Sequence, residues 1–377
     1  MKLHKELRLH KHIDELYKWK NSEPFIPPFV EISPISYCNQ KCKFCYTTHL
    51  MKKLEKMPTE IMKKIFTEFS IVGIKGLRIQ GIGEPTLHPD LAECINLAGK
   101  TVVKKKYDGG LVESKIDIAL TTNGVLLKPK MIQECIENLF SVKISVIDSS
   151  KKRYSEFHRV DENQWNLVVK NIEYATNFIK ASNLKCNFHT TIYAEDTTYE
   201  NLFEITNFCK NLGFSLVTIS NALYSPRTPN PNSKNTDFKK LEDHENYLKN
   251  LETKLLDLED KDFSVDLCMR NSKGVQRSYV DESKKINCPG INFSTVIDAK
   301  GFIYPCWRYW GKEEYSYGNL HENTFLDIWM SENRIKVNKK MSEEYYSEST
   351  CVPCSHNRIN EQLLELQRST GWENFLS

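Results

Sequence analysis

Between residues 29 and 221 the sequence alternates short apolar runs with longer amphipathic segments. Apolar runs of this length are typical of buried strands, and the segments between them are typical of helices that cover a sheet. Strands and helices that alternate at this spacing form parallel βαβ units, because a parallel neighbour needs a crossover connection. Six strands are expected, which are too few for a closed eight-stranded barrel. The sequence therefore predicts an α/β fold built on an open, partial (β/α)6 barrel.

The predicted elements divide the chain into four parts. These are an N-terminal helix at 1–28, the partial barrel at 29–224, a linker with a charged helix at 225–285, and a small C-terminal α+β unit at 286–377. The barrel strands are expected at 29–35, 76–82, 115–121, 142–147, 186–193 and 214–220, and its helices at 58–69, 89–98, 129–138, 163–181 and 199–212. In the C-terminal unit, two short apolar runs flank Asp298-Ala-Lys-Gly301, which predicts a β-hairpin.

Size and charge narrow the class of protein. The 377 residues are enough for one large domain and a smaller one. A formal net charge of +3 gives no case for a nucleic-acid partner. No stretch is long and apolar enough to span a bilayer, and the first 20 residues lack the apolar core of a signal peptide. Those residues instead predict an amphipathic helix packed over the main domain. We therefore expect a cytoplasmic protein without a membrane partner.

Twelve cysteines are many for a cytoplasmic chain, in which thiols serve as metal ligands or redox groups more often than in disulfides. Seven of them form two sets, one at 38–45 and one at 288–354. The remaining five stand alone in the sequence: Cys94, Cys135, Cys186, Cys209 and Cys268. We expect these five to be packing residues, and the sequence does not single out any of them as a hydrogen-atom donor.

The first set, Cys38, Cys42 and Cys45, lies on one short loop directly after the first predicted strand. Three thiolates so placed converge on one metal centre at the carboxyl ends of parallel strands, where ligands bind. A [4Fe–4S] cluster has four irons, so three cysteines leave one iron open. The rival is zinc, which normally takes four ligands in a structural site. A fourth cysteine is absent nearby, although His49 follows four residues after Cys45.

In spacing and position, this loop resembles that of the radical S-adenosylmethionine (SAM) superfamily. The resemblance covers about residues 29–221. It implies that the amino and carboxylate groups of SAM take the open iron, and that an electron then cleaves the sulfonium. The products would be methionine and a 5′-deoxyadenosyl radical able to take hydrogen from an unactivated carbon. A flavodoxin or ferredoxin-type protein is the implied reductant.

The resemblance also extends to single positions. Phe44 stands where the family has an aromatic or apolar residue beside the adenine. Gly83 and Glu84, within Gly81-Ile82-Gly83-Glu84-Pro85 after the second strand, match the motif that meets the SAM amino group. Asn123 and Ser145 match polar positions near the SAM carboxylate and ribose. Further pocket candidates are Arg159 and His189.

The second set comprises Cys288, Cys306, Cys351 and Cys354. With Tyr-Pro-Cys306 closing a predicted hairpin and Trp329 on a predicted helix, it resembles the twitch domain, a shortened SPASM domain. The resemblance implies one auxiliary [4Fe–4S] cluster whose four irons are all held by protein. Such a cluster has no open iron for substrate, but it can accept or deliver an electron. The alternative from spacing alone is a structural zinc site with four cysteine ligands.

Three functions remain open at this point. The first is oxidation of a sugar or aminocyclitol alcohol with the auxiliary cluster as electron acceptor, and the second is maturation of a ribosomal peptide by epimerisation or crosslinking. The third is a zinc-stabilised binding protein without catalysis. The related molybdenum-cofactor cyclase holds its C-terminal cluster with three cysteines and ends in Gly-Gly. Since this chain has four and ends in Asn374-Phe-Leu-Ser377, we do not expect that activity. The sequence assigns no catalytic base.

Overall fold

The fold is taken from a computed structural model. It describes residues 9–43, 45, 47–51, 53–107, 110–146, 148–193, 199–220, 254–268, 287–344 and 356–368. Three residues of the predicted sites, Phe44, Cys351 and Cys354, lie outside the described residues.

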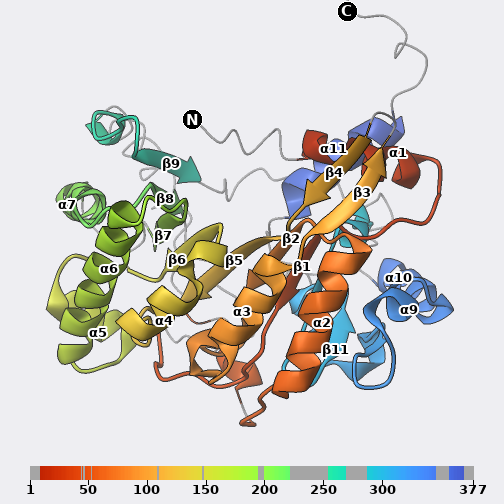
Figure 1. The fold of residues 1–377 in the computed structure, drawn as a ribbon, viewed down its shortest axis with the longest axis horizontal. Coiled ribbons are helices and arrows are strands. Elements are labelled where there is room, and N and C mark those ends of the chain that lie inside the picture. The colour runs from red at the N-terminus through yellow and green to blue at the C-terminus, as the bar shows by residue number, and fades with distance from the viewer. Residues whose placement is uncertain are drawn as a thin grey trace, which may run out of the picture.

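The centre of the fold is a ten-stranded sheet (Figure 1). In spatial order its strands are β12 (Gly318–Asn319), β11 (Phe302–Tyr304), β10 (Ser294–Ile297), β1 (Phe29–Ile32), β2 (Gly76–Ile79), β5 (Asp117–Thr122), β6 (Ser141–Ile144), β7 (Asn187–Tyr193), β8 (Leu216–Ser220) and β9 (Ser264–Cys268). From β10 to β9 all neighbours are parallel, whereas β11 and β12 run antiparallel. A separate hairpin pairs β3 (Val103–Tyr107) with β4 (Gly110–Ser114).

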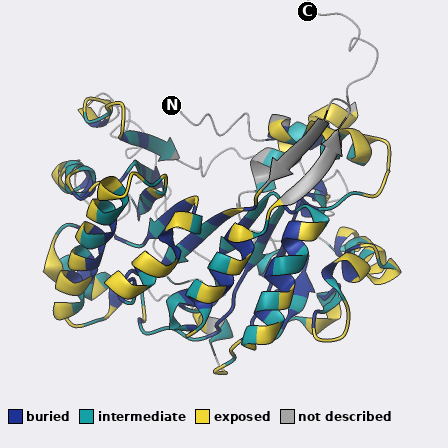
Figure 2. Ribbon diagram, in the orientation of Figure 1, coloured by how far each residue is buried: buried dark blue, intermediate teal, exposed yellow. Residues whose placement is uncertain are grey.

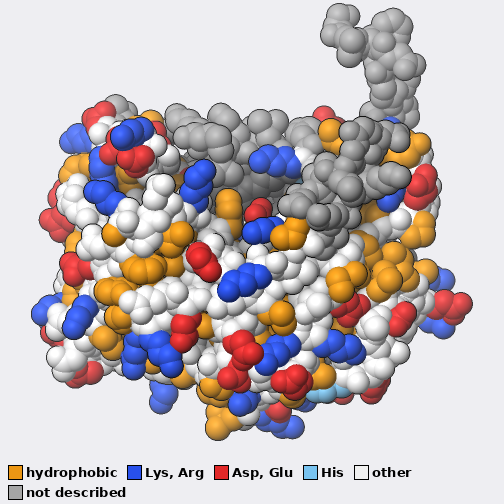
Figure 3. All heavy atoms as spheres, viewed as in Figure 1, with side chains coloured by type: hydrophobic (Ala, Val, Ile, Leu, Met, Phe, Trp, Pro, Cys, Tyr) orange, Lys and Arg blue, Asp and Glu red, His pale blue; other side chains and the backbone are white. Residues whose placement is uncertain are grey.

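Helices cover one face of this sheet, and Figure 2 shows their buried sides turned toward the strands. The helices of this layer are α2 (Thr59–Val72), α3 (Leu91–Lys100), α4 (Pro129–Cys135), α5 (Lys151–His158), α6 (Asn163–Ala181) and α7 (Tyr199–Asn211). The other described helices are α1 (Ile13–Lys20), α9 (Phe325–Trp329), α10 (Glu332–Glu343) and α11 (His356–Arg368). On the face seen in Figure 3, Lys and Arg side chains are interspersed with Asp and Glu.

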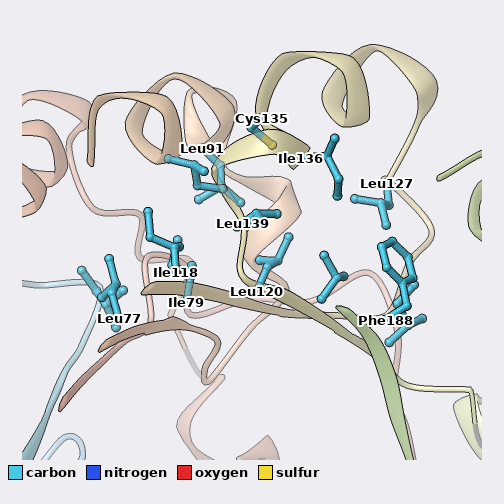
Figure 4. Packing of buried hydrophobic residues seen from close by; sticks show 14 of the residues in the cluster. Leu77, Ile79, Leu91, Ile118, Leu120, Leu127, Cys135, Ile136, Leu139 and Phe188 are labelled. Carbon is cyan, nitrogen blue, oxygen red and sulfur yellow. The ribbon is translucent and has the colours of Figure 1, made fainter. Parts of the chain in front are cut away.

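The main core lies between the sheet and these helices. Buried and half-buried residues alternate along the strands, so Leu77, Ile79, Ile118 and Leu120 point toward the helices (Figure 4). Among the lone cysteines, Cys94, Cys135 and Cys209 are fully buried in this core, and Cys186 packs against it half-buried. The expectation that these four are packing residues is confirmed. The side chain of Cys268 lies outside the described residues.

The sheet is longer than the sequence predicts. The six predicted barrel strands are present, and the predicted hairpin is formed by β10 and β11. In addition, β10 pairs parallel with β1 and β9 pairs parallel with β8, so further strands extend the open sheet at both ends. The strand β9 was not predicted, because its range was assigned to the linker and charged helix. The hairpin that carries Cys306 is therefore continuous with the barrel sheet.

The N-terminal helix contacts the barrel, since Lys75 before β2 donates to Glu15 at 2.9 Å, but its apolar contacts lie in the C-terminal unit. Leu16 and Trp19 pack with the buried Phe293 and Leu363, and the Trp19 and Phe293 rings lie 6.1 Å apart. Over the described residues, the structure contains no helix with the length and apolar character needed to cross a membrane.

Candidate active site

The loop after β1 carries the three thiols of the first cysteine set. Cys38, Cys42 and Cys45 are each half-buried. Burial raises the pKa of Cys38 to about 11, with further contributions from the charges of Glu84 and Cys45. Burial also raises the pKa of Cys42, and the charges of Cys45 and Cys38 add to that rise. As thiolates, the three side chains would repel one another. A bound positive charge, such as that of the irons in a cluster, would compensate this repulsion.

The three thiols are not arranged around a single ion. Within the described part of the chain, no three His, Cys, Asp or Glu side chains form a group that could hold one metal ion. A [4Fe–4S] cluster instead distributes its thiolate ligands over separate irons. That these three cysteines hold such a cluster, with one iron left for another ligand, stays a prediction.

Glu84 joins the ends of β2 and β5. Its side chain is buried, and its Oε1 accepts hydrogen bonds from the Thr86 backbone N–H at 3.1 Å and from the hydroxyls of Thr86 and Thr122 at 2.6 and 2.5 Å. Its Oε2 accepts from the Asn123 backbone N–H at 2.8 Å. Burial raises the pKa of Glu84, and these four donors oppose that rise. The carboxylate thus fixes the two loops beside the cysteines, and its predicted contact with SAM stays a prediction.

Gly83 lets the loop after β2 lie directly against the cysteine loop. A Cβ on Gly83 would lie 2.1 Å from the carbonyl oxygen of Tyr37 and 2.6 Å from its nitrogen. Backbone hydrogen bonds from Gly83 N to Ile35 O and from Glu84 N to Tyr37 O hold the two loops together. Only glycine permits backbone to approach this closely next to Cys38.

Asn123 brings the end of β5 to the same place. Its Nδ2 donates to Asn39 Oδ1 at 2.7 Å and lies 3.9 Å from Cys38 Sγ, and its Oδ1 accepts from Val125 N at 3.0 Å. Four predicted elements of the site, the cysteine loop, Gly83, Glu84 and Asn123, are therefore in mutual contact. Both ends of the Asn123 amide are already bound by the chain, so its predicted role toward SAM remains a prediction.

The other predicted positions differ in their surroundings. Ser145 follows β6 half-buried, and its backbone N–H donates to Thr122 O. His189 lies half-buried on β7 in register with Lys143. Arg159 is exposed and ends α5 with a φ of 52°, in the left-handed region. The predicted roles of these three residues in the SAM pocket stay predictions.

A polar network that the sequence did not reveal lies behind Cys42. His158 Nδ1 lies 3.2 Å from Cys42 Sγ and 2.9 Å from Gln40 Oε1. Burial lowers the pKa of His158 to about 3, which the backbone carbonyl of Ser145 opposes, so the ring is neutral near pH 7. The ring stacks on Tyr154. The only sequence signal was the spacing of Tyr154 and His158, which places them on one side of a helix.

The second cysteine set is described in part. Cys288 precedes β10, and Cys306 follows β11, which is antiparallel to β10. Both cysteines therefore lie at the amino end of β10, whereas the loop with Cys38 leaves the carboxyl end of its parallel neighbour β1. Asn360 on α11 donates from Nδ2 to Cys288 Sγ at 3.2 Å. The predicted grouping of these two with Cys351 and Cys354, which lie outside the described residues, stays a prediction.

The buried role of Glu84 gives a stability prediction. Glu84→Gln is expected to lower the free energy of unfolding by about 2 kcal/mol, because the amide NH2 would face a buried backbone donor and leave it unpaired. Chemical denaturation measures the change. Glu60→Gln is the matched control, since the Glu60 side chain is 85% exposed on α2. Equal stability of the two variants would contradict the account of Glu84 as a link between loops.

Comparisons with known proteins agree with this geometry. The model of the radical SAM superfamily matches residues 32–209, and that of SPASM, an iron–sulfur cluster-binding domain, matches residues 288–355. A tungsten-containing aldehyde ferredoxin oxidoreductase cofactor-modifying protein of Pyrococcus furiosus is 24% identical over 87% of this chain and 86% of its own. A probable GTP 3′,8-cyclase of Methanococcus vannielii is 26% identical over 72% of this chain and 77% of its own.

Solved structures show the same fold. SuiB of Streptococcus suis bound to SAM covers 93% of this chain and 75% of its own, with a TM-score of 0.61 and 18% identity. The predicted fold class is thereby confirmed. The two family models, one of SAM enzymes and one of an iron–sulfur cluster-binding domain, confirm both predicted cofactor types. The chain is an enzyme of the radical SAM superfamily that carries a C-terminal iron–sulfur cluster-binding domain of the SPASM type.

Proposed function

We propose that this enzyme removes hydrogen from a carbon of a peptide substrate and completes a two-electron oxidation. Cys38, Cys42 and Cys45 are the proposed ligands of the SAM-binding cluster, and Cys288, Cys306, Cys351 and Cys354 those of the auxiliary cluster. When bound, these groups and SAM supply a 5′-deoxyadenosyl radical and an acceptor for one electron. The residues of the chain hold the two sites in fixed relation and keep water from the space between them.

One observation carries the proposal: a single packed cluster joins the surroundings of the two sites. Ile82, next to Gly83, belongs to it together with the buried Tyr309 and Trp310 of the C-terminal unit. Leu50 of the cysteine loop region and Cys306 pack against the same cluster. Dry, aromatic packing between the sites is the environment in which an electron can leave a substrate radical for a second acceptor without reaction with water.

The choice of a peptide as substrate is supported by structurally similar proteins that were solved with bound peptides. SuiB in complex with its precursor peptide SuiA matches 93% of this chain with a TM-score of 0.62. The structure of anSMEcpe with AdoMet and the Kp18Cys peptide matches 89% with a TM-score of 0.51. The sequence alone placed a sugar or aminocyclitol first, on the count of four auxiliary cysteines, and that substrate class remains the second candidate. We further propose a flavodoxin or ferredoxin-type reductant and action in the cytoplasm.

The test is deoxyadenosine formation by the anaerobically purified enzyme with SAM, dithionite and candidate substrates. Peptides encoded beside the gene form one arm, and sugars and aminocyclitols form the other. We expect deoxyadenosine together with a peptide product that has lost two hydrogen atoms. An unchanged peptide mass with inverted stereochemistry would indicate epimerisation instead. Turnover of a polyol without turnover of any peptide would overturn the choice of substrate.

A further inference from the structure

We propose that His158 sets the reduction potential of the SAM-binding cluster by donating a hydrogen bond from Nδ1–H to the Cys42 thiolate. This inference rests on the proposed assignment of the three loop cysteines as cluster ligands. It makes His158 a positioning and tuning residue, since the ring touches a ligand and not the substrate. The experiment below separates failure of this inference from failure of the ligand assignment.

The distance between His158 and Cys42 is the first argument. His158 Nδ1 lies 3.2 Å from Cys42 Sγ, within hydrogen-bond distance of a sulfur acceptor. By comparison, Cys38 Sγ accepts from the Gln40 backbone N–H at 3.4 Å, and the Asn123 amide nitrogen lies 3.9 Å from it. His158 Nδ1 thus lies closer to Cys42 Sγ than either of these nitrogens lies to Cys38 Sγ. His158 belongs to α5 and not to the cysteine loop itself.

The position of the proton is the second argument. Gln40 donates from Nε2 to Tyr154 Oη at 3.1 Å and to Gln164 Oε1 at 3.2 Å. Its Oε1 therefore faces His158, and two acceptors, this oxygen and the Cys42 sulfur, converge on Nδ1. We therefore place the single proton of the neutral ring on Nδ1, where it can reach both of these acceptors. A Cys42 bound to iron has no proton of its own, so it is purely an acceptor in this pair.

The rigidity of the donor is the third argument. Two backbone hydrogen bonds tie the cysteine loop to the end of α5 on either side of Cys42. They run from Lys41 N to His158 O at 3.2 Å and from Lys43 N to Phe157 O at 2.8 Å. The His158 ring is fully buried and stacks on Tyr154 with 4.1 Å between centroids. The donor is therefore held in place before any cluster binds, as residues that hydrogen-bond to metal ligands commonly are.

The expected consequence has a definite sign. Hydrogen bonds to the sulfurs of an iron–sulfur cluster raise its reduction potential, because they stabilise the additional negative charge of the reduced state. Removal of the donor in His158→Phe, which keeps an aromatic ring for the stack on Tyr154, should favour the oxidised cluster about tenfold. For one electron this corresponds to about 59 mV toward more negative potential.

The test is a redox titration of the holoenzyme followed by electron paramagnetic resonance, without substrate. Wild type is compared with His158→Phe and with His158→Asn, whose amide nitrogen takes the place of Nδ1. We expect the lower potential in His158→Phe only, with the auxiliary cluster unchanged in all three proteins. Equal potentials in wild type and His158→Phe at full iron content would overturn the inference. If the wild-type holoenzyme, with Cys38, Cys42 and Cys45 intact, showed no signal from the first cluster, this would count instead against the ligand assignment.

A second measurement does not depend on the His158→Phe variant. Wild-type enzyme labelled with ¹⁵N-histidine should show a coupling between the reduced first cluster and a histidine nitrogen in pulsed electron paramagnetic resonance. His158→Asn should lose this coupling and keep its potential. Absence of any histidine coupling in the wild type would overturn the inference even if His158→Phe failed to fold.

Discussion

Gly83→Ala is expected to lower the rate of SAM cleavage by about 100-fold, because it displaces the backbone that positions the first cluster. The new Cβ would lie 2.1 Å from Tyr37 O and 2.7 Å from Tyr37 C. These are backbone atoms of the residue before Cys38, so no side-chain rotation can relieve the contact. The loop must move, and we expect the variant to lose iron from the first cluster while it keeps the auxiliary cluster.

Gly76→Ala is the matched control for this prediction. Gly76 begins β2, the strand that precedes Gly83, but its Cβ would meet only the Phe29 side chain at 3.3 Å. A side chain can shift by a few tenths of an ångström, so this variant should keep its iron and its activity. Deoxyadenosine formation and iron analysis of both variants form the measurement. Normal activity of Gly83→Ala would show that the close approach of the two loops is not needed.

The sequence predicted those elements whose apolar pattern is strong. The helix at 163–181 was predicted with both of its bounds, because Trp165, Val168, Ile172 and Ala175 recur at helical spacing and are buried. The helix α5 was not predicted, since among its eight residues only Tyr154 and His158 are buried and the rest are mostly polar. The strand β9 was hidden for a similar reason: it is five residues long and lies in a highly charged stretch.

The candidate site was predictable where its residues are close in sequence. Cys38, Cys42 and Cys45 share one loop, and Gly83 and Glu84 are adjacent, so spacing alone identifies them. The contacts that support them come from far along the chain. Thr122 binds Glu84 across 38 residues, and His158 reaches Cys42 across 116 residues. Such pairs depend on the order of strands in the sheet, which no local pattern in one sequence specifies.

The extended sheet also changes the relation between the two cysteine sets. The sequence placed Cys288 and Cys306 in a separate C-terminal unit. In the structure, the hairpin β10–β11 between them pairs with β1, and Ser33 N donates to Ile297 O at 2.8 Å just before the cysteine loop. Movement of the C-terminal unit is thereby coupled to the loop that follows β1. A fixed distance between the two sites fits the proposed function, in which an electron leaves the substrate radical for the auxiliary cluster.

The account predicts two four-iron clusters, each with its own cysteine set. The most direct test is iron and sulfide analysis of the anaerobically purified protein beside a variant in which Cys38, Cys42 and Cys45 are all alanine. We expect the variant to keep about half of the wild-type iron, still with a brown colour, and to form no deoxyadenosine from SAM. Unchanged iron content in the variant, or a colourless wild-type protein that contains zinc, would contradict the account.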